Sequence, residues 1–276
     1  MDTLEIFNQE DYEKNIDFRG IFIFKGKTLK VRGNSVVIAS GNSEVYASGN
    51  SEVNAYNNSI VSAYDNSIVS AYDKSVVRAY DKSVVRASGN SKVYAYRKSV
   101  VDAYDDSIVR ASGNSKVIAH DKSVVRAYDD SIVNASGNSK ILLKNSDIKY
   151  KITDNAKFFL LKNKEYDLES FKFLAEKYDE NSVVLYKSVN PETNCDFKTG
   201  QIEYKINEYV EAPDWIADPE IECGNGLHLC LTPQETQIFN KGKILKCRVN
   251  LCDISIYRYN MEKVRCRKVF VMEEYE

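Results

Sequence analysis

Between Gly33 and Lys144, small and apolar residues alternate with polar ones, and the pattern recurs every eight residues through fourteen copies of one phrase. In each copy the third residue is Ser, the fifth is Val or once Ile, and the seventh is Ala until Leu143. Residues two apart lie on the same face of a β-strand, so Ser, Val and Ala are expected to share an inner face. The pattern therefore predicts a strand in each octad, because a helix would need a period near 3.6.

The first two residues of most octads read Gly-Asn, Asp-Asn, Asp-Lys or Asp-Asp. Gly tolerates the left-handed backbone conformation, and the side chains of Asp and Asn form hydrogen bonds to their own backbone. These pairs are therefore expected to turn the chain. A uniform repeat of a short strand and a turn leaves no room for a helix. We therefore predict a β-solenoid, that is, a parallel β-helix whose coils stack and whose dry centre is made of inward Val.

The number of octads in a coil is inferred from the outward positions, since residues one coil apart become vertical neighbours. Three octads per coil would align two columns of similar residues: Tyr56, Tyr80, Tyr104 and Tyr128 in one, and Val36, Ile60, Val84, Ile108 and Ile132 in the other. This alignment favours a three-sided coil of 24 residues. Duplication of a 24-residue unit would produce the same similarity in a flat two-sided coil, and that alternative stays open.

Both ends of the repeat depart from the octad in a way that is typical of caps. Residues 1–32 are expected to form an N-terminal lead-in with helical character at 2–16 and a cap at 17–32. The cap would place larger apolar residues inward, namely Ile21, Ile23, Leu29 and Val31. The solenoid is expected to run over residues 33–161 and to close with Phe158 and Leu160, because a terminal coil has no neighbour to cover it.

Composition changes after the repeat, which indicates a second domain at residues 167–276. All four Pro, the single Trp and all six Cys lie after residue 190. Asp167 is a candidate N-cap for a helix that follows it, and residues 233–239 fit a second helix. Strand-like runs lie at 182–190, 243–251 and 263–274. This order predicts a small α+β domain.

Charge and segment patterns exclude several classes. Residues 33–144 carry 13 Lys and Arg against 11 Asp and Glu, so no basic surface for nucleic acid is expected. No run approaches the ~20 apolar residues of a membrane span, and the acidic N-terminus has no secretory pattern. With Cys expected as reduced thiols, the predicted location is the cytoplasm of whichever cell makes the protein.

Four segments of the C-terminal domain carry a resemblance: LYKSVN, ECGNGLHLC, KILKCRVNLCDISIY and KVRCRKVFV. Over about residues 183–272 they resemble a domain at the C-terminus of bacteriophage proteins similar to the T-even rapid-lysis B protein. Leu251 departs from that pattern, where Pro is usual. The resemblance implies a phage or mobile-element accessory protein that acts on host functions, including host defence, and it brings no settled reaction.

The candidate binding residues come from the same segments: Tyr186, Lys187, Cys223, Gly224, Gly226, His228, Arg265 and Arg267. No residue is assigned a catalytic or metal-ligating role, and no cofactor is expected. Cys223, His228 and Cys230 are close in sequence, but this spacing is not a recognised zinc pattern. Buried thiols, and a histidine that fixes a loop through hydrogen bonds, are the simpler interpretation.

A second resemblance provides an enzymatic alternative. The Tyr186-Lys187 strand, the Gly-Leu-His turn and the Thr-Pro helix start look similar to the split nicotinamide pocket of ADP-ribosyltransferases. This resemblance implies that His228 takes the place of a stacking Tyr and that Lys187 lies near the ribose. Catalysis would also need a late Glu, for which Glu273 and Glu274 are close to the end of the chain. Our main hypothesis remains a non-enzymatic protein that binds host or phage macromolecules, with an enzyme acting on NAD or a related nucleotide as the alternative.

The two outward columns are candidate interfaces. The Tyr column could bind a protein partner, although stacking within the solenoid wall would explain it equally well. The Val and Ile column would leave an exposed aliphatic stripe, so homo-oligomerisation along it is expected. The repeat has no Thr for an ice-binding ladder, no calcium-binding roll motif, and no local break that would hold the carboxylates of a polysaccharide-cleaving enzyme.

Overall fold

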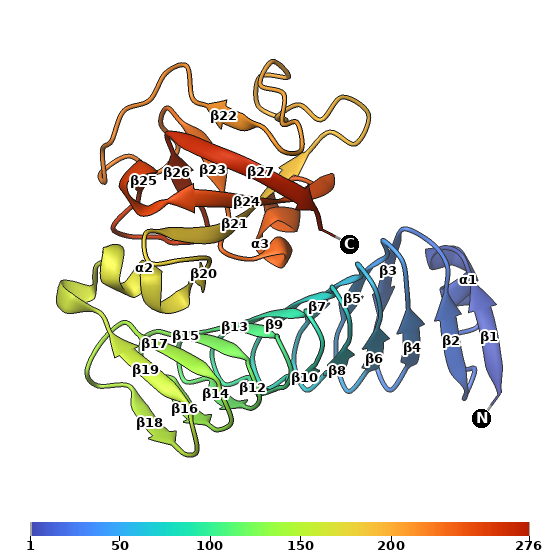
Figure 1. Ribbon diagram of the computed structural model, residues 1–276. Helices are drawn as coiled ribbons and strands as arrows, with labels where there is room; N and C mark the ends of the chain where they lie inside the picture. The colour runs from blue at the N-terminus through green and yellow to red at the C-terminus, as the bar shows by residue number, and fades with distance from the viewer. Residues whose placement is uncertain (1, 276) are drawn as a thin grey trace. The chain divides into compact units, whose positions relative to one another are not determined.

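The computed structural model describes residues 2–275, and its internal contacts divide the chain into two units after Leu160 (Figure 1). The first unit is a parallel β-solenoid. Its strands form one sheet of ten and one sheet of nine, so the chain makes about ten turns. The second unit contains antiparallel sheets and two short helices. The predicted fold class, a β-solenoid followed by a small α+β region, is therefore confirmed at this level.

Odd and even octads supply different sheets. The ten-stranded sheet contains, in spatial order, β1 (Thr3–Ile6), β2 (Ile21–Phe24), β4 (Val36–Ala39), β6 (Glu52–Ala55), β8 (Ile68–Ala71), β10 (Val84–Ala87), β12 (Val100–Ala103), β14 (Lys116–Ala119), β16 (Ile132–Ala135) and β18 (Lys149–Ile152). The nine-stranded sheet contains β3 (Thr28–Val31), β5 (Glu44–Ala47), β7 (Ile60–Ala63), β9 (Val76–Ala79), β11 (Lys92–Ala95), β13 (Ile108–Ala111), β15 (Val124–Ala127), β17 (Lys140–Leu143) and β19 (Lys157–Leu160).

The predicted three-sided coil of 24 residues is wrong. Val85 lies between Val69 and Val101 in the ladder, so vertical neighbours within the repeat are 16 residues apart and each coil has two sides. The physical reason is the small volume of the inward side chains. Each octad contributes one Val with Ser and Ala beside it, a set that fills the narrow space between two sheets more readily than the wider interior of a triangle.

The inward assignment of Ser, Val and Ala is confirmed. Every Val or Ile at the fifth position, from Val37 to Ile141, is fully buried, and the Ala residues of the seventh position are buried with them. The repeat Ser residues from Ser43 onward are also buried at the corners. Several of their hydroxyls, such as that of Ser67, donate to the carbonyl three residues earlier, here Tyr64 at 2.5 Å. This local bond supports the turn before each strand.

The backbone conformation at the first residue of the octads explains why Gly or Asp occupies most of these positions. Asp65, Asp105 and Asp129 have φ of 58°, 55° and 54°, in the left-handed region. Their carboxylates accept hydrogen bonds from the backbone N–H one coil earlier; Asp65 Oδ2 lies 3.1 Å from the N–H of Gly49. Gly tolerates this backbone without a side chain, while Asp tolerates it and ties two coils together.

At the N-terminal end, helix α1 (Gln9–Lys14) closes the core. Tyr12 is fully buried and packs edge-on against Phe22, with ring centroids 5.2 Å apart. The helical lead-in is thus present, but the strand β1 before it was not predicted. The inward positions predicted for β2 were wrong by one residue. Phe22 and Phe24 point inward, and Ile21 and Ile23 do not.

The shift in β2 arises because the turn into β3 is one residue shorter than the turns of the octads. Leu29 and Val31 of β3 are buried as predicted. At the other end, Phe158 and Leu160 occupy the inward register beside Ile141 and Leu143, yet they remain 46% and 43% exposed. This last coil therefore has the apolar residues expected of a cap without their burial.

The two outward columns do not exist as predicted, because a 16-residue coil distributes them over two sheets. Tyr56 and Tyr104 follow strands of the ten-stranded sheet, whereas Tyr80 and Tyr128 follow strands of the other. Val36, Val84 and Ile132 are likewise separated from Ile60 and Ile108. Tyrosines 16 apart stack instead, with ring centroids 4.9 to 5.0 Å apart, in the pairs Tyr56–Tyr72, Tyr64–Tyr80 and Tyr80–Tyr96.

The second unit has two antiparallel sheets. The larger has the order β20 (Glu176–Lys177), β21 (Ser182–Val189), β24 (Lys243–Asn250), β27 (Lys268–Glu274), β22 (Tyr209–Glu211), and the smaller has the order β23 (Leu227–Leu229), β26 (Val264–Cys266), β25 (Ile254–Ser255). The run at 263–274, expected as one strand, is split between β26 and β27 in different sheets. Two 3-10 turns lie at Lys162–Lys164 and Leu251–Asp253.

Both predicted helices of this unit are present, and Asp167 caps the first of them as expected. Helix α2 (Leu168–Leu174) begins after Asp167, whose carboxylate accepts from the N–H of Ser170 at 2.8 Å in a capping box. Helix α3 (Pro233–Phe239) begins after Thr232, with Pro in the first turn. Proline suits this position because its missing N–H would have no helical partner.

Candidate functional site

The candidate site lies where the two sheets of the second unit meet. Tyr186 of β21 and Cys230, which follows β23, exchange two backbone hydrogen bonds of 2.9 and 2.8 Å. Beyond this bridge the two strands belong to different sheets. Lys187 is one residue from the bridge on β21, and His228 is two residues from it on β23, and both line the opening between the sheets.

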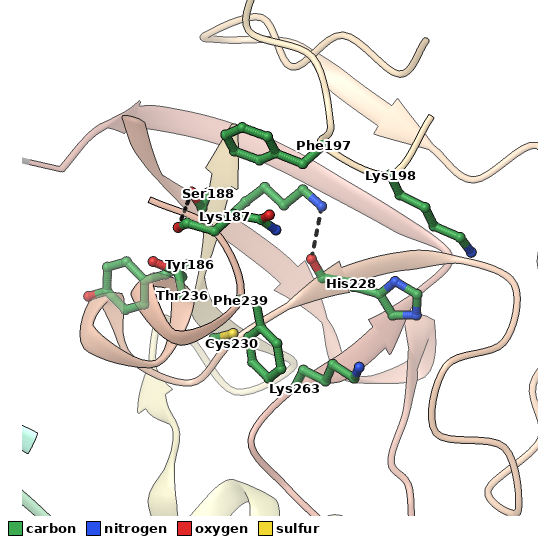
Figure 2. A pocket seen from close by; sticks show the side chains of 11 residues that line it. Tyr186, Lys187, Ser188, Phe197, Lys198, His228, Cys230, Thr236, Phe239 and Lys263 are labelled. Atoms are coloured by element: carbon green, nitrogen blue, oxygen red, sulfur yellow. Dashed lines mark hydrogen bonds between the residues drawn. The ribbon is translucent and has the colours of Figure 1, made fainter. Parts of the chain in front are cut away.

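A pocket of about 270 Å³ occupies this opening. Figure 2 shows residues from five segments of the chain around it. Its lining consists of Tyr186, Lys187, Ser188, Phe197, Lys198, His228, Cys230, Thr236, Phe239, Asn240 and Lys263. Three of these are lysines, and none is Asp or Glu. A pocket of this size suits part of a small molecule.

Burial dominates the electrostatics of the two central residues. The amine of Lys187 donates to the carbonyl oxygen of His228 at 3.2 Å (Figure 2) and lies 5.2 Å from the ring centroid of Tyr204. Burial lowers the pKa of Lys187, and the Asp196 carboxylate partly opposes that shift. Burial, followed by the charges of Lys187 and Lys263, lowers the pKa of His228 to about 4. The imidazole is therefore neutral near pH 7.

His228 also provides an unused polar atom. Its Nε2 is buried and has no hydrogen-bond partner among residues 2–275. A buried polar group without a partner costs free energy, so such atoms often indicate where a water or a ligand binds. The interpretation in which His228 fixes a loop through side-chain hydrogen bonds gains no support from this geometry.

A polar loop places Phe197 and Lys198 at the pocket. The carboxylate of Asp196 organises the loop: it accepts from the hydroxyl of Thr199 at 2.7 Å and from the N–H groups of Lys198 and Ile202 at 3.0 Å. Burial raises the pKa of Asp196, but these hydrogen bonds outweigh it, and the net direction is downward. The Lys198 amine has no ion pair within the described part of the chain.

The third lysine approaches from the segment before β26. The Lys263 amine lies 5.0 Å from the ring centroid of Phe239, the last residue of α3, and 2.8 Å from the sulfur of Cys223. Cys223 is exposed and does not line the pocket itself. Cys223 therefore contacts a pocket-lining residue, Lys263, without lining the pocket itself.

Gly224 and Gly226 lie in the loop before β23, Arg265 lies on β26, and none of the three lines the pocket. The Arg265 guanidinium is buried and donates to the backbone carbonyls of Ile216 and Asn225 at 3.0 and 3.1 Å. A Cβ on Gly224 would lie 2.8 Å from that guanidinium, and one on Gly226 would lie 2.9 Å from the ring of Trp215. These residue types are therefore explained by packing.

The remaining residues named from the sequence lie elsewhere. Arg267 forms an ion pair with Asp253 at 2.7 Å. Glu273 and Glu274, the late acidic residues of the transferase alternative, lie 3.7 and 3.5 Å from the amines of Lys246 and Lys243 and do not line the pocket. Of the eight candidate binding residues, Tyr186, Lys187 and His228 are brought together in the pocket.

Sequence reasoning did not find Phe197, Lys198, Phe239 or Lys263. Lys263 stands at the start of a quoted segment, but its direction depends on how β26 enters the smaller sheet. Phe197 and Lys198 lie in a loop whose only signal is the turn-forming run Asp196 to Gly200. No periodicity could have assigned these residues to the pocket.

Neither a disulfide nor a metal cluster is formed within the described residues. All six cysteines are free thiols, and no group of three or more His, Cys, Asp or Glu side chains is placed to hold a metal ion in residues 2–275. Cys230 and Cys247 are buried, in keeping with the interpretation of the thiols as small apolar residues.

A second hollow, of about 490 Å³, lies on the first coils of the solenoid and is lined in part by Gln9, Tyr46 and Tyr64. Its charged residues include Glu13 and Arg32, which form an ion pair with each other at 2.6 Å. The charged residues of this hollow are thus of both signs, whereas those of the pocket beside His228 are all lysines.

Comparison with family models, with curated proteins and with solved structures finds no match to this chain. No helix within residues 2–275 is both long enough and apolar enough to span a membrane.

Proposed function

We propose that this protein acts by binding, and that its C-terminal unit takes a small anionic ligand that carries an aromatic ring, of the nucleotide class, in the pocket beside His228. The observation that carries the proposal is the charge of the lining: Lys187, Lys198 and Lys263 contribute to it and no carboxylate does. Lysine ammonium groups are common partners of phosphate oxygens.

The aromatic part of the ligand is supported by the two phenylalanines. Phe197 is 41% exposed and Phe239 is 40% exposed, although both line the pocket, so an incoming planar ring would cover apolar surface. Stacking of a base on an aromatic side chain contributes about 1 to 3 kcal/mol. His228 also lines the pocket and is neutral near pH 7, so it adds a polar side chain to the lining without adding charge.

The wider role remains as the resemblance implies. In this proposal the chain is a phage or mobile-element accessory protein that acts in the host cytoplasm, without catalysis, on host or phage macromolecules, with host defence as the affected function. The solenoid would provide the rod and the protein-binding surface, and the pocket would make the C-terminal unit responsive to a nucleotide.

Binding is tested by titrating the full chain with ADP, ATP, NAD⁺, adenosine and inorganic phosphate, using calorimetry and thermal unfolding. We expect saturable binding of the nucleotides, weaker binding of adenosine and of phosphate alone, and about 2.7 kcal/mol of added stability at a hundredfold excess over Kd. Lys198→Ala and Lys263→Ala should each weaken binding by about tenfold or more, since a charged hydrogen bond contributes about 1.5 to 3 kcal/mol.

Lys172→Ala is the matched control, because Lys172 is in the same unit, pairs with Glu169 and does not line the pocket. It should leave affinity unchanged. No nucleotide binding at millimolar concentration, or equal loss in the control and the pocket variants, would contradict the proposal.

A second candidate function is NAD-dependent transfer. Lys187 on β21 and His228 on β23 both line one pocket, an arrangement that the transferase resemblance implies. Against it, Glu273 and Glu274 do not line the pocket. The two functions are separated by incubating the protein with NAD⁺ and measuring free nicotinamide. We expect binding without release; release that disappears in His228→Ala would favour the enzyme.

A further inference from the structure

The two ends of the solenoid differ in how their cores are closed. At the N-terminal end, Phe22, Phe24 and Leu29 are at most 1% exposed. At the C-terminal end, Tyr150, Phe158 and Leu160 hold inward register positions but are 44%, 46% and 43% exposed. The rings of Tyr150 and Phe158 lie 4.9 Å apart, so the exposed residues form one apolar patch at the end of the core.

Each end also carries a strand with one unpaired edge. In the ten-stranded sheet, β1 is the first strand and β18 the last, so neither has a partner on its outer side within the described residues. In the other sheet the first strand, β3, is already covered, because the side chain of Gln9 bonds to both the N–H and the C=O of Lys30, at 2.8 and 3.0 Å. The open strand at the N-terminal end is therefore β1.

We propose that β1 of a second copy of this chain pairs with β18, so that copies associate head to tail and the ten-stranded sheet continues from one molecule to the next. All strands of this sheet are parallel, and β1 has the same inward and outward alternation as the octads. Continuing the ladder by one coil places Leu4 on Tyr150, Glu5 on Lys151 and Ile6 on Ile152.

Charge favours this occupant over a copy of the same end. The last coil, residues 144–160, carries four Lys and two Asp, and Lys149 and Lys151 point outward on β18. Lysines on an edge strand oppose pairing with a like-charged strand. Residues 2–16 carry five acidic residues and one Lys, and the outward Glu5 falls on Lys151 in the continued register. A tail-to-tail contact would instead bring the lysines together.

Helix α1 fits the same arrangement. It stands beside β3 in the position of a further strand, so in the neighbouring molecule it would face β19, where Phe158 and Leu160 are exposed. Glu10 and Glu13 of α1 are exposed, and Lys157 begins β19. The contact joins two different surfaces, so it repeats without closing unless the rotation happens to form a ring.

The experiment measures mass against concentration for the full chain by light scattering and sedimentation velocity, with electron microscopy of the assembled sample. We expect a mass that rises beyond the dimer as concentration increases and that falls with added salt. Glu5→Lys and Lys151→Glu should each weaken association by about tenfold or more, which corresponds to about 1.4 kcal/mol.

Charge exchange identifies the contact. The double variant Glu5→Lys with Lys151→Glu, and an equimolar mixture of the two single variants, should both recover assembly, because opposite charges again meet. Glu5 also pairs with Lys25 in the same molecule at 2.5 Å. Lys25→Ala is therefore the control for loss of that pair, and it should assemble like the parent chain.

Three outcomes would overturn the proposal. A monomer at all concentrations up to about 100 μM would show that the ends do not associate with useful affinity. A mass that stops at the dimer would show a symmetric contact. Unchanged association in both single variants, with their thermal midpoints intact, would show assembly through another surface. Recovery of assembly in the exchanged pair is specific to β1 on β18.

Discussion

At the residue scale, the place of a residue within the octad decides whether its side chain faces the core or water. Val85 and Arg86 are neighbours in β10; Val85 is fully buried among the stacked valines, and Arg86 is exposed. The backbone is the same at both positions, so only the direction of the side chain differs. This pair tests the inward assignment without changing the strand.

Val85→Asp should destabilise the solenoid by several kcal/mol, about 3 to 5, because a carboxylate would enter a dry core without a partner. Arg86→Asp should change the free energy of unfolding by about 0.5 kcal/mol or less. Chemical denaturation followed by circular dichroism gives both values. Similar losses for the two variants would mean that the core is not where the valines lie.

The corner residue makes a second prediction. Asp65 adopts φ of 58° and its carboxylate binds the N–H of Gly49. Asp65→Gly keeps the backbone conformation and loses the hydrogen bond, at a cost of about 1 kcal/mol. Asp65→Ala also loses the hydrogen bond. In addition, Ala has a Cβ that is strained in the left-handed region and no polar side chain to compensate for it, so Asp65→Ala should cost about 1 kcal/mol more than Asp65→Gly. The reverse order, measured by denaturant midpoints, would contradict this account of the corner.

The lowered pKa of His228 predicts that the stability of the protein depends on pH. Burial, then Lys187 and Lys263, lower its pKa from 6.5 to about 4, so between these values the unfolded chain binds more protons than the folded one. This contribution to stability is complete above about pH 6.5, falls as pH falls toward 4, and then levels off. The difference in unfolding midpoint between the parent chain and His228→Gln, measured from pH 7.5 to 4, should show that slope. A constant difference would argue against burial of the imidazole.

At the scale of the elements, neighbouring coils are joined by their backbone ladders and by contacts at the corners. Tyr80 stacks on Tyr64 below and on Tyr96 above, with centroids 5.0 Å apart in both pairs. Ser takes the corresponding position in other octads, so the strand and turn accept either residue. The stacked rings are therefore a contact between coils that is separable from the fold of each octad.

Tyr80→Ser should cost about 1 to 3 kcal/mol, since it removes two aromatic pairs worth about 0.5 to 1.5 kcal/mol each. The matched control is Tyr56→Ser, which removes the single stacked pair with Tyr72 and should cost about half as much. Thermal and denaturant unfolding would measure both. Equal costs would indicate that exposure of the rings, and not stacking, governs this column.

At the scale of the whole molecule, the contacts divide after Leu160 into a solenoid and an antiparallel unit. Their cores are built differently: the first contains small side chains from every octad, and the second contains strands that are far apart in sequence, such as β21 beside β24. Stability of the first kind is close to a sum over coils, whereas the second depends on non-local pairing.

Unfolding of the chain should therefore proceed in more than one transition. We expect Val85→Asp to lower the midpoint of the solenoid transition and a bound nucleotide to raise the midpoint of the other. Differential scanning calorimetry of the full chain, with and without ligand, would resolve them. A single transition shifted equally by both perturbations would show that the chain unfolds as one cooperative system.

The sequence by itself determined the strand in each octad, the inward set of Ser, Val and Ala, the helix capped by Asp167, and the separate character of the C-terminal unit. These features follow from periods of two, from backbone preferences at Gly and Asp, and from capping side chains, all of which act over a few residues. Each of these features can therefore be recognised in a short segment of the sequence.

Only the tertiary structure decided how many octads make a coil, because every octad has the same strand and turn, and only stacking makes residue 69 a neighbour of residue 85. It also decided the composition of the pocket. Lys187 and His228 were candidates from resemblance, but Lys198 and Lys263 join them through a loop held by Asp196 and through the meeting of two sheets at Tyr186 and Cys230. Such contacts join distant segments, and no local pattern encodes them.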